Sequence, residues 1–399
     1  MWLKEIWLEN IRAFEKTPVL SLSRGINVFV GENNSGKSTL IRTPLLLNGD
    51  ELPPTLKRHQ ETRSTVRFKL GDVIEFFPQL AEPNIQEFFV DYIQEPGQAR
   101  QKRNAYRLTS DGSRPGVGFN PLSTREPNAF IYPYLSSRKV LQFEEAVNSN
   151  VTLEVRPNLS NLYAKIDRLS NPASPSHSYF REACESILGY VISTHASTNG
   201  KQAGLLVNEF KSIPLTAMGD GVANLLGLIA NLAVAENRLF LIEELENDLH
   251  PKAIKALVSL IEEKSETNQF LISTHSNVVL QALSKSNPEI FEVKLERSSL
   301  PPNSKVERLE NSPESRQALL EDLGYFLGDM SVYEGWIFFE EASAERLVRD
   351  FFIPWFSKRL RGRIRTYSAA GVDEVEAKFE NFNKLFVFIH LQPLYRNKA

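Results

Sequence analysis

The chain has 399 residues, of which 42% are hydrophobic and 24% charged, so it can form one large core or two ordinary ones and does not belong to the disordered class. Its 46 basic and 49 acidic residues give a formal net charge of -3, which makes no strong electrostatic case for nucleic acid and leaves room for a local basic surface, so net charge neither supports nor excludes DNA as a partner. The single cysteine excludes an internal disulfide, and no apolar run approaches the roughly 20 residues that cross a bilayer, so we expect a cytoplasmic protein without a membrane partner.

The N-terminal part of the sequence predicts strands that lead into a helix. "WLKEIWLENI" alternates between apolar and polar residues, and "GINVFVG" predicts a turn followed by a short buried strand. The next segment, "ENNSGKSTLIRTPLLL", has helical spacing. Residues 50–135 contain short strand patterns separated by many turn residues, and we interpret them as an inserted β-rich lobe.

Apolar strands alternate with amphipathic helices in the later part of the chain. The helices are "GVANLLGLIANLAVAE" and "PKAIKALVSLIEEKSE", and the strands are "RLFLIEE" and "QFLIST". This alternation predicts an α/β fold with a mostly parallel sheet covered by helices on both faces. We place this first domain at residues 1–310 and a smaller α/β unit at residues 311–399, which contains "GWIFFEE", "SAERLVRDFFIPWFSKRL" and "RIRTYSA".

A phosphate-binding motif lies between a predicted strand and a predicted helix. Residues 31–38, "GENNSGKS", fit the pattern G-x-x-x-x-G-K-[ST] in the context that this pattern requires. The glycines let backbone N–H groups surround phosphates, Lys37 places a positive charge against them, and the Ser38 hydroxyl binds Mg²⁺. The sequence therefore predicts an ATP and Mg²⁺ site. Its nucleotide-contacting residues are Gly31, Asn33, Asn34, Ser35, Gly36, Lys37, Ser38 and Thr39.

Two acids end the predicted strand "LFLIEE", as in a Walker B strand, where the first acid orients Mg²⁺ and the second polarises the attacking water. We assign these roles to Glu243 and Glu244. Since Glu243 replaces the more usual aspartate and is one methylene longer, we expect its contact to Mg²⁺ to pass through water. The alternative is that both acids form the solvated first turn of a helix. His275, at the tip of the next strand in "STHS", is expected to donate a hydrogen bond to the γ-phosphate.

In this order, "GENNSGKST", "TAMGDGVANLL", "LFLIEELENDLHP" and "STHS" resemble the ABC-type ATPase heads of the SMC, RecF and OLD families over most of residues 1–290. The resemblance implies that Gly219, Asp220 and Gly221 stand in the signature motif, which reaches the ATP of a second subunit. It therefore implies a homo-oligomer, a dimer or higher. The position of the signature serine holds Thr216 or Ala217 instead. The insertion lacks sustained heptads, which argues against an SMC protein with its long coiled coil.

The stretch "LLEDLGYFLGDMSVYEGWIFFEEASAERLVRDFF" resembles the junction at which the ATPase of OLD-family nucleases gives way to a Toprim domain. The resemblance implies that Glu341 and Glu345 bind Mg²⁺ or Mn²⁺ for DNA cleavage, and the i, i+4 spacing places both on one helix face. An alternative register uses Glu340. The competing interpretation is an ordinary helix start, with Glu345 paired to Arg349. No Asp-x-Asp motif follows Glu341, so we expect an incomplete Toprim domain, either because the chain is part of a longer nuclease or because the domain is degenerate.

The function implied by this resemblance is an OLD-like ATPase that regulates Mg²⁺-dependent DNA cleavage, in bacterial defence against phage. Its partners would be ATP, DNA, further copies of the chain and a co-encoded defence protein, for example a reverse transcriptase with its nucleic acid. Two alternatives stay open: a nuclease-dead ATPase acting as a DNA- or partner-binding switch, and a RecF-like DNA repair ATPase.

Overall fold

A computed structural model of the chain describes residues 1–51, 57–59, 62–73, 76, 85–98, 101–109, 111–136, 149–156, 161–198, 200–218, 220–247, 249–283, 286–298, 300–310, 315, 319, 335–357 and 364–368. The chain divides into two compact units, Met1–Leu309 and Glu310–Ala399. No helix among the described residues has both the length and the apolar character needed to cross a membrane.

The first sheet of the N-terminal unit is antiparallel and has the order β2-β1-β5-β6-β7, with β3 also pairing with β1. Its strands are β1 (Trp2–Ile11), β2 (Phe14–Lys16), β3 (Leu20–Ser21), β5 (Ser64–Gly71), β6 (Ile85–Gln94) and β7 (Lys102–Thr109). Strands β5 to β7 occupy the region that we expected to form an inserted lobe. They continue the sheet that β1 begins, because β5 pairs with β1 along most of its length, so these described strands of the insertion belong to the N-terminal sheet.

The second sheet has the order β15-β14-β4-β13-β12-β8, and all its pairings except β14 with β15 are parallel. Its strands are β4 (Ile26–Val30), β8 (Ile131–Tyr134), β12 (Leu239–Glu243), β13 (Gln269–Thr274), β14 (Glu289–Glu296) and β15 (Asn303–Leu309). Every residue of β4, β12 and β13 is buried, as expected for parallel strands that are covered on both faces. The prediction of a mostly parallel α/β sheet is confirmed.

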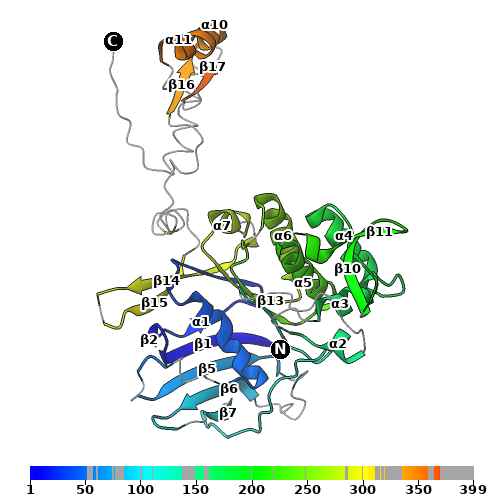
Figure 1. Cartoon of the computed structure of the whole chain (residues 1–399). Helices are drawn as coiled ribbons and strands as arrows, with labels where there is room; N and C mark the ends of the chain where they lie inside the picture. The colour runs from blue at the N-terminus through cyan, green and yellow to red at the C-terminus, as the bar shows by residue number, and fades with distance from the viewer. Residues whose placement is uncertain are drawn as a thin grey trace. The chain divides into compact units, whose positions relative to one another are not determined.

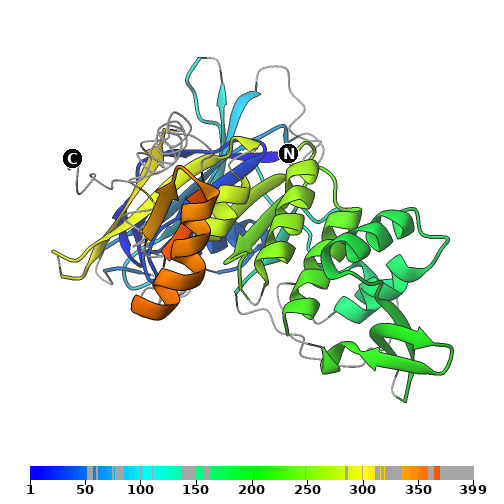
Figure 2. The same ribbon diagram turned by 90° about the horizontal axis from the view of Figure 1, so that it is seen from above.

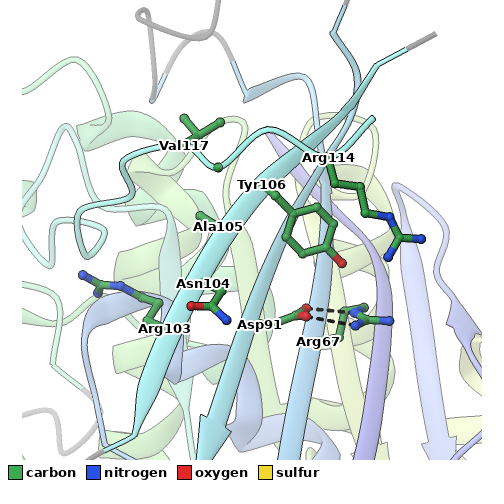
Figure 3. Close-up of a pocket in the computed structure, with 9 residues that line it drawn as sticks. Arg67, Asp91, Arg103, Asn104, Ala105, Tyr106, Arg114 and Val117 are labelled. Atoms are coloured by element: carbon green, nitrogen blue, oxygen red, sulfur yellow. Dashed lines mark hydrogen bonds and ion pairs between the residues drawn. The ribbon is translucent and has the colours of Figure 1, made fainter. Parts of the chain in front are cut away.

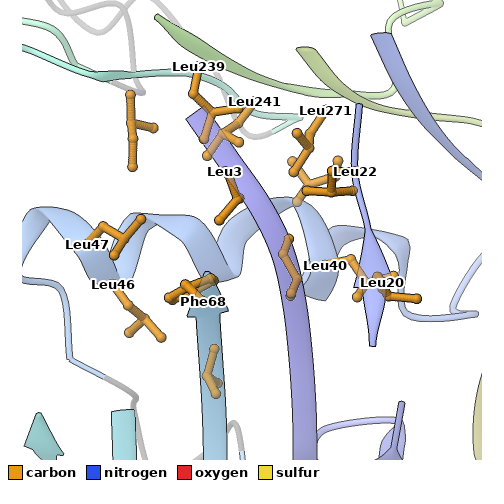
Figure 4. Close-up of a cluster of buried hydrophobic side chains, with 14 of the residues drawn as sticks. Leu3, Leu20, Leu22, Leu40, Leu46, Leu47, Phe68, Leu239, Leu241 and Leu271 are labelled. Carbon is orange, nitrogen blue, oxygen red and sulfur yellow. The ribbon is translucent and has the colours of Figure 1, made fainter. Parts of the chain in front are cut away.

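Helix α1 (Lys37–Arg42) continues into η1 (Thr43–Asn48), and this segment lies between the two sheets (Figure 1). Its leucines pack against apolar side chains from both sheets, and together they form the main core (Figure 4). The labelled members of this core are Leu3, Leu20, Leu22, Leu40, Leu46, Leu47, Phe68, Leu239, Leu241 and Leu271. Full burial of each such side chain contributes on the order of 1.5–3 kcal/mol. This packing fixes the position of α1, whose first residue is Lys37.

The other face of the parallel sheet is covered by α5 (Asp220–Val234), α6 (Pro251–Lys264) and α7 (Asn277–Leu283), as Figure 1 shows. A further group of elements packs beside them: α2 (Ser149–Leu153), α3 (Leu162–Ser170), α4 (His177–Leu188), and the antiparallel strands β9 (Ser193–Ser197), β10 (Gly200–Asn208) and β11 (Lys211–Pro214). Figure 2 shows this green group on the side of the unit away from the blue antiparallel sheet.

The C-terminal unit contains two parallel strands, β16 (Gly335–Phe339) and β17 (Ile364–Ser368). They are connected through α10 (Ala342–Leu347), η7 (Val348–Phe352) and α11 (Ile353–Phe356). The helix expected from "GVDEVEAKFENFNKLFVFIH" lies outside the described residues. The assignment of this unit to the Toprim class stays a prediction.

Candidate functional site

Three neighbouring parallel strands, β4, β13 and β12, end at the same edge of the second sheet. Val30 pairs with Thr274, and Ser273 pairs with Glu243, so the next residues along each strand emerge side by side. Ligands of open α/β sheets bind outside the carboxyl ends of the strands. The predicted phosphate loop follows β4, His275 follows β13, and β12 ends on Glu243 with Glu244 directly after it.

Close packing requires both glycines of the phosphate loop. Gly36 has a φ of 104°, and a Cβ there would lie 2.7 Å from the ring of Phe14. A Cβ on Gly31 would lie 2.2 Å from the carbonyl oxygen of Val293. Asn34 also has a positive φ, 65°, which asparagine tolerates better than most residues. The loop conformation is therefore dictated by these residues and by the sheet beneath it.

The remaining residues of the loop divide into buried and accessible ones. Ser35 and Thr39 are buried, Ser38 is partly buried and Asn33 is exposed. The hydroxyl of Ser35 is buried without a hydrogen-bond partner in the described part of the chain. A loop with two glycines, a buried lysine and an unpaired hydroxyl fits a phosphate group.

Lys37 points back over the loop. Its side chain is buried, and Nζ donates hydrogen bonds to the carbonyl oxygens of Gly31 and Glu32, each at 2.7 Å. Burial lowers the pKa of Lys37, whereas the negative charges of Glu244, Glu246 and Glu32 raise it, with a net lowering. These charges act on Lys37 because the acids that follow β12 lie close to the phosphate loop. The ammonium group is placed to exchange the two carbonyl oxygens for phosphate oxygens.

The carboxylate of Glu243 is fully buried and is held by protein donors. Arg42 donates from Nε at 2.6 Å and from Nη2 at 2.7 Å, and Ser136 donates its backbone N–H and its hydroxyl, each at 2.9 Å. Burial raises the pKa of Glu243, but the hydrogen bonds from Arg42 and Ser136 outweigh it and lower the pKa overall. Hydrogen bonding to Glu243 likewise raises the pKa of Arg42. The carboxylate thus connects the end of α1 to β12, and its predicted role in orienting Mg²⁺ stays a prediction.

Glu244 has a different environment from its neighbour. It is half-buried and has a φ of 48°, a left-handed conformation that is costly for a residue with a side chain. Asn247 Nδ2 donates to Glu244 Oε2 at 2.5 Å, and the backbone N–H of Glu244 donates to Ser273 Oγ at 3.3 Å. Such strain is typical of functional positions, and it turns the chain at the point where the second acid leaves the strand.

His275 is oriented by Glu246. Nδ1 of His275 lies 3.0 Å from Glu246 Oε1, and the same carboxylate accepts hydrogen bonds from the His275 backbone N–H and from Thr274 Oγ1, each at 2.9 Å. The carboxylate lies beside one ring nitrogen and so restricts the orientation of the imidazole, while the other nitrogen lies on the far side of the ring. The side chain of His275 is 40% exposed, so the ring remains accessible.

Sequence reasoning missed three charged residues of this site. Arg42 is one helical turn beyond the motif, and Glu246 is the third acid in "IEELEND". Their closeness in sequence to the predicted site residues could therefore have identified both as candidates. Arg12 follows β1 with a φ of 47°. Burial and the charge of Arg42 lower the pKa of Arg12, whereas Glu243 raises it, which places all three charged groups in one neighbourhood.

The predicted signature residues are only partly described. Gly219 lies outside the described residues, Asp220 is the first residue of α5, and Gly221 is partly buried in it. Thr216 and Ala217 belong to η5 (Leu215–Ala217), which directly precedes this helix. Their predicted contact with the nucleotide of a second subunit stays a prediction.

The predicted acids of the C-terminal unit also differ from each other. Glu341 is exposed and accepts a hydrogen bond from Ser343 Oγ at 2.9 Å. Glu345 is buried, and its carboxylate accepts two hydrogen bonds from Arg349, at 2.9 and 3.0 Å, and one from the hydroxyl of Thr366. The pair of Glu345 with Arg349 is the contact expected for an ordinary helix start. The described residues contain no group of three potential metal ligands, and the metal roles of both acids stay predictions.

Residues 26–281 match the family described as AAA domain, putative AbiEii toxin, type IV toxin–antitoxin system. No curated protein matches the sequence. Among solved structures, an SMC head bound to the C-terminal winged-helix domain of ScpA has a TM-score of 0.54 and 16% identity, over 79% of this chain and 100% of that one. An Smc head domain from Pyrococcus yayanosii, with a coiled coil and joint, has a TM-score of 0.51 and 11% identity, over 80% of this chain and 99% of that one.

At these identities the likeness to the SMC heads concerns the fold alone, and it confirms the prediction of an ABC-type ATPase fold. The comparisons give no specific support to the OLD family or to a Toprim domain.

Proposed function

The chain belongs to the AAA-domain family described as putative AbiEii toxins, and we propose on this basis that it binds MgATP and hydrolyses it as an ABC-type ATPase. The observation that best supports this proposal is the position of Lys37. Its ammonium group is held on the carbonyl oxygens of the phosphate loop and is close enough to Glu244 and Glu246 for their charges to shift its pKa.

The residues of the site have different roles in the proposed hydrolysis. Backbone N–H groups of the loop and the Lys37 ammonium bind the phosphates, and Mg²⁺ held by Ser38 would neutralise their charge. Glu244 accepts a hydrogen bond from the attacking water and polarises it. His275, oriented by Glu246, donates a hydrogen bond to the γ-phosphate, where negative charge accumulates in the transition state.

The test is a steady-state ATPase assay together with binding of a fluorescent ATP analogue. We expect Lys37→Ala to lose binding and hydrolysis, and Glu244→Gln to keep binding but to lose hydrolysis by about 100-fold or more, by analogy with the loss of other catalytic groups. Lys252→Ala, an exposed lysine on α6, is the control and should leave both unchanged. If Glu244→Gln hydrolyses ATP like the unmodified protein, the assignment of the catalytic acid is wrong.

We further propose that ATP binding joins two copies of the chain through the signature residues Asp220 and Gly221. The measurement is the mass of Glu244→Gln by light scattering, with and without ATP. A mass that doubles with ATP, and does not double when Lys37→Ala is added, supports the dimer. A monomer under both conditions contradicts it.

A second candidate function is an OLD-like nuclease controlled by the ATPase. It is supported by Glu341, which is exposed and follows β16, a strand paired in parallel with β17. The test is cleavage of plasmid and single-stranded DNA with Mg²⁺ or Mn²⁺, with and without ATP. Loss of cleavage in Glu341→Ala but not in Glu340→Ala supports the register in which Glu341 binds the metal. Loss of cleavage in Glu340→Ala but not in Glu341→Ala supports the register that uses Glu340. Absence of cleavage by the unmodified chain favours the DNA- or partner-binding switch instead.

This second proposal also includes an anti-phage role, a cytoplasmic location and a co-encoded partner, for example a reverse transcriptase with its nucleic acid. Phage plating on cells that express the whole locus tests the role. Protection that Lys37→Ala abolishes supports it, and protection that is unaffected by Lys37→Ala separates defence from ATP binding.

A further inference from the structure

The carboxylate of Glu243 is the acid that the sequence assigns to Mg²⁺, but protein donors already occupy it. A carboxylate offers about four lone-pair positions to hydrogen-bond donors. Oε1 of Glu243 accepts from Arg42 Nε at 2.6 Å. Oε2 accepts from Arg42 Nη2 at 2.7 Å and from the backbone N–H and the hydroxyl of Ser136, each at 2.9 Å. These donors leave little room for a metal-bound water molecule to donate to the same carboxylate.

The charges around Glu243 are also unfavourable for a divalent cation. The guanidinium of Arg42 is in direct contact with the carboxylate. Arg12 is close enough that both partners of this pair affect its pKa, which burial and Arg42 lower and Glu243 raises. Two positive charges therefore surround one negative charge, and like charges repel most strongly where water is excluded.

The place of Arg42 on α1 separates this carboxylate from the predicted metal ligand Ser38. The two residues are four positions apart in the helix, so they lie on the same face, about 6 Å apart along the axis. Glu243 is bound at the later position. The hydroxyl of Ser38 makes no hydrogen bond in the part of the chain that the structure describes, so it is available to Mg²⁺.

A second pair with the same geometry lies outside the proposed ATP site, on the antiparallel sheet. Arg67 of β5 donates two hydrogen bonds to Asp91 of β6, at 2.8 and 2.9 Å, as Figure 3 shows. The side chains of Arg67 and Asp91 are 39% and 9% exposed, compared with 38% and 0% for Arg42 and Glu243. Hydrogen bonding to the carboxylate raises the pKa of both arginines. The chain therefore offers a matched control for the loss of such a pair.

We propose that Glu243 is a positioning residue, which acts through Arg42 on α1 and through Ser136 on the segment after β8, and that Mg²⁺ is bound without it. The longer side chain of glutamate, compared with aspartate, brings the carboxylate to Arg42. Lys37 and Ser38 begin α1 and Arg42 ends it, so a hold on Arg42 orients the helix that presents both residues. The inference rests on the proposed function, because it concerns the metal of bound ATP.

The first test is binding of a fluorescent, non-hydrolysable ATP analogue to the full chain, with Mn²⁺ as the probe for Mg²⁺ and with EDTA. The ratio of the two dissociation constants measures the contribution of the metal. Loss of a residue that orients a metal ligand typically lowers metal affinity about 10–100-fold, so a metal-orienting Glu243 would lower the ratio by this factor in Glu243→Gln. We expect instead a ratio within about twofold of the original, with binding about fivefold or more weaker in both conditions because α1 is less well held. Ser38→Ala should lower the ratio about tenfold or more, and the control Asp91→Asn should change neither quantity.

The second test needs no nucleotide. Arg42→Met with Glu243→Met replaces the pair by apolar side chains, which is often neutral for stability, so this double variant also serves for the metal ratio where Glu243→Gln is not folded. It removes the acceptor of the Ser136 backbone N–H. Hydrogen exchange of the peptide that contains Ser136 should therefore be about tenfold or more faster, as expected for the loss of a hydrogen bond to a charged group. Asp91→Asn should leave this exchange unchanged.

Four results would overturn the proposal: a ratio that falls about tenfold or more in Glu243→Gln or in the double variant, analogue binding by Glu243→Gln as tight as by the unmodified chain, unchanged exchange at Ser136, or equal effects of Asp91→Asn. Thermal melts of all variants establish that they are folded. If the unmodified chain binds the analogue neither with Mn²⁺ nor with EDTA, the proposed function is wrong and the metal part of this proposal is wrong with it. Exchange at Ser136 then decides the positioning part separately.

Discussion

The ion pair between Arg42 and Glu243 permits a quantitative prediction, because its two partners differ in burial. The side chain of Glu243 is 0% exposed and that of Arg42 is 38% exposed. Removing one partner of a buried pair typically costs about 3–5 kcal/mol, because the other charge stays buried. In Arg42→Ala, the two donors from Ser136 remain on Glu243. We therefore expect a loss of about 3 kcal/mol in the free energy of unfolding, at the low end of that range.

Urea unfolding followed by circular dichroism measures this loss, with Arg308→Ala as the control. Arg308 pairs with Glu289 at the surface, with side chains 59% and 28% exposed, and an exposed pair is worth about 0–1 kcal/mol. Glu243→Gln removes the charge but keeps the shape, so the double variant with Arg42→Ala should be at least about 0.5 kcal/mol more stable than the sum of the single effects. Additive effects, or a loss in Arg42→Ala no larger than in Arg308→Ala, would refute this account of the pair.

Further predictions concern acid stability, the loop, the histidine and the cysteine. The pKa of Glu243 is lower in the folded protein than its ordinary value of 4.5, so ionised Glu243 stabilises the fold at pH values above 4.5. This contribution should be lost as the pH falls below 4.5 towards the folded pKa. In urea titrations, the stability of the unmodified protein relative to Glu243→Gln should therefore decline in this pH range. Gly36→Ala should lose binding of the ATP analogue and lower the melting temperature, because its Cβ would lie 2.7 Å from Phe14; unchanged binding would contradict this. Glu246→Gln should lower kcat for ATP about tenfold or more while binding persists, whereas an equal kcat would mean that Glu246 does not position His275. Burial raises the pKa of the Cys184 thiol to about 12. A thiol-labelling reagent that forms mixed disulfides should therefore label Cys184 at about pH 8 only when urea has unfolded the protein.

The sequence was most informative where one residue type is chemically required. The glycines and Lys37 of the phosphate loop are such residues, because backbone approach and a buried cation admit few substitutes. The strand patterns of β4, β12 and β13 also predicted the parallel sheet, because strands covered on both faces must be apolar throughout.

What the sequence did not reveal depends on pairing over long distances. The partner of β5 is β1, more than fifty residues earlier, and periodicity alone does not specify which strands pair. The contact between Arg42 and Glu243 spans 201 positions, and only the packing of α1 against β12 brings them together. Local patterns therefore predicted the elements, whereas the partners of charged side chains required the fold.

Both pairs of acids that suggested chemistry contain one buried member. Glu243 and Glu345 are each held by an arginine and a hydroxyl, because a carboxylate without water must have fixed donors. Glu244 and Glu341 are the more accessible acids, so they are the ones that can meet water, metal or phosphate. Substitution by glutamine should accordingly reduce stability at Glu243 and Glu345, and activity at Glu244 and Glu341. In each pair, the fold therefore uses the buried acid to hold a helix in place, and the accessible acid is the one whose substitution we expect to affect activity most.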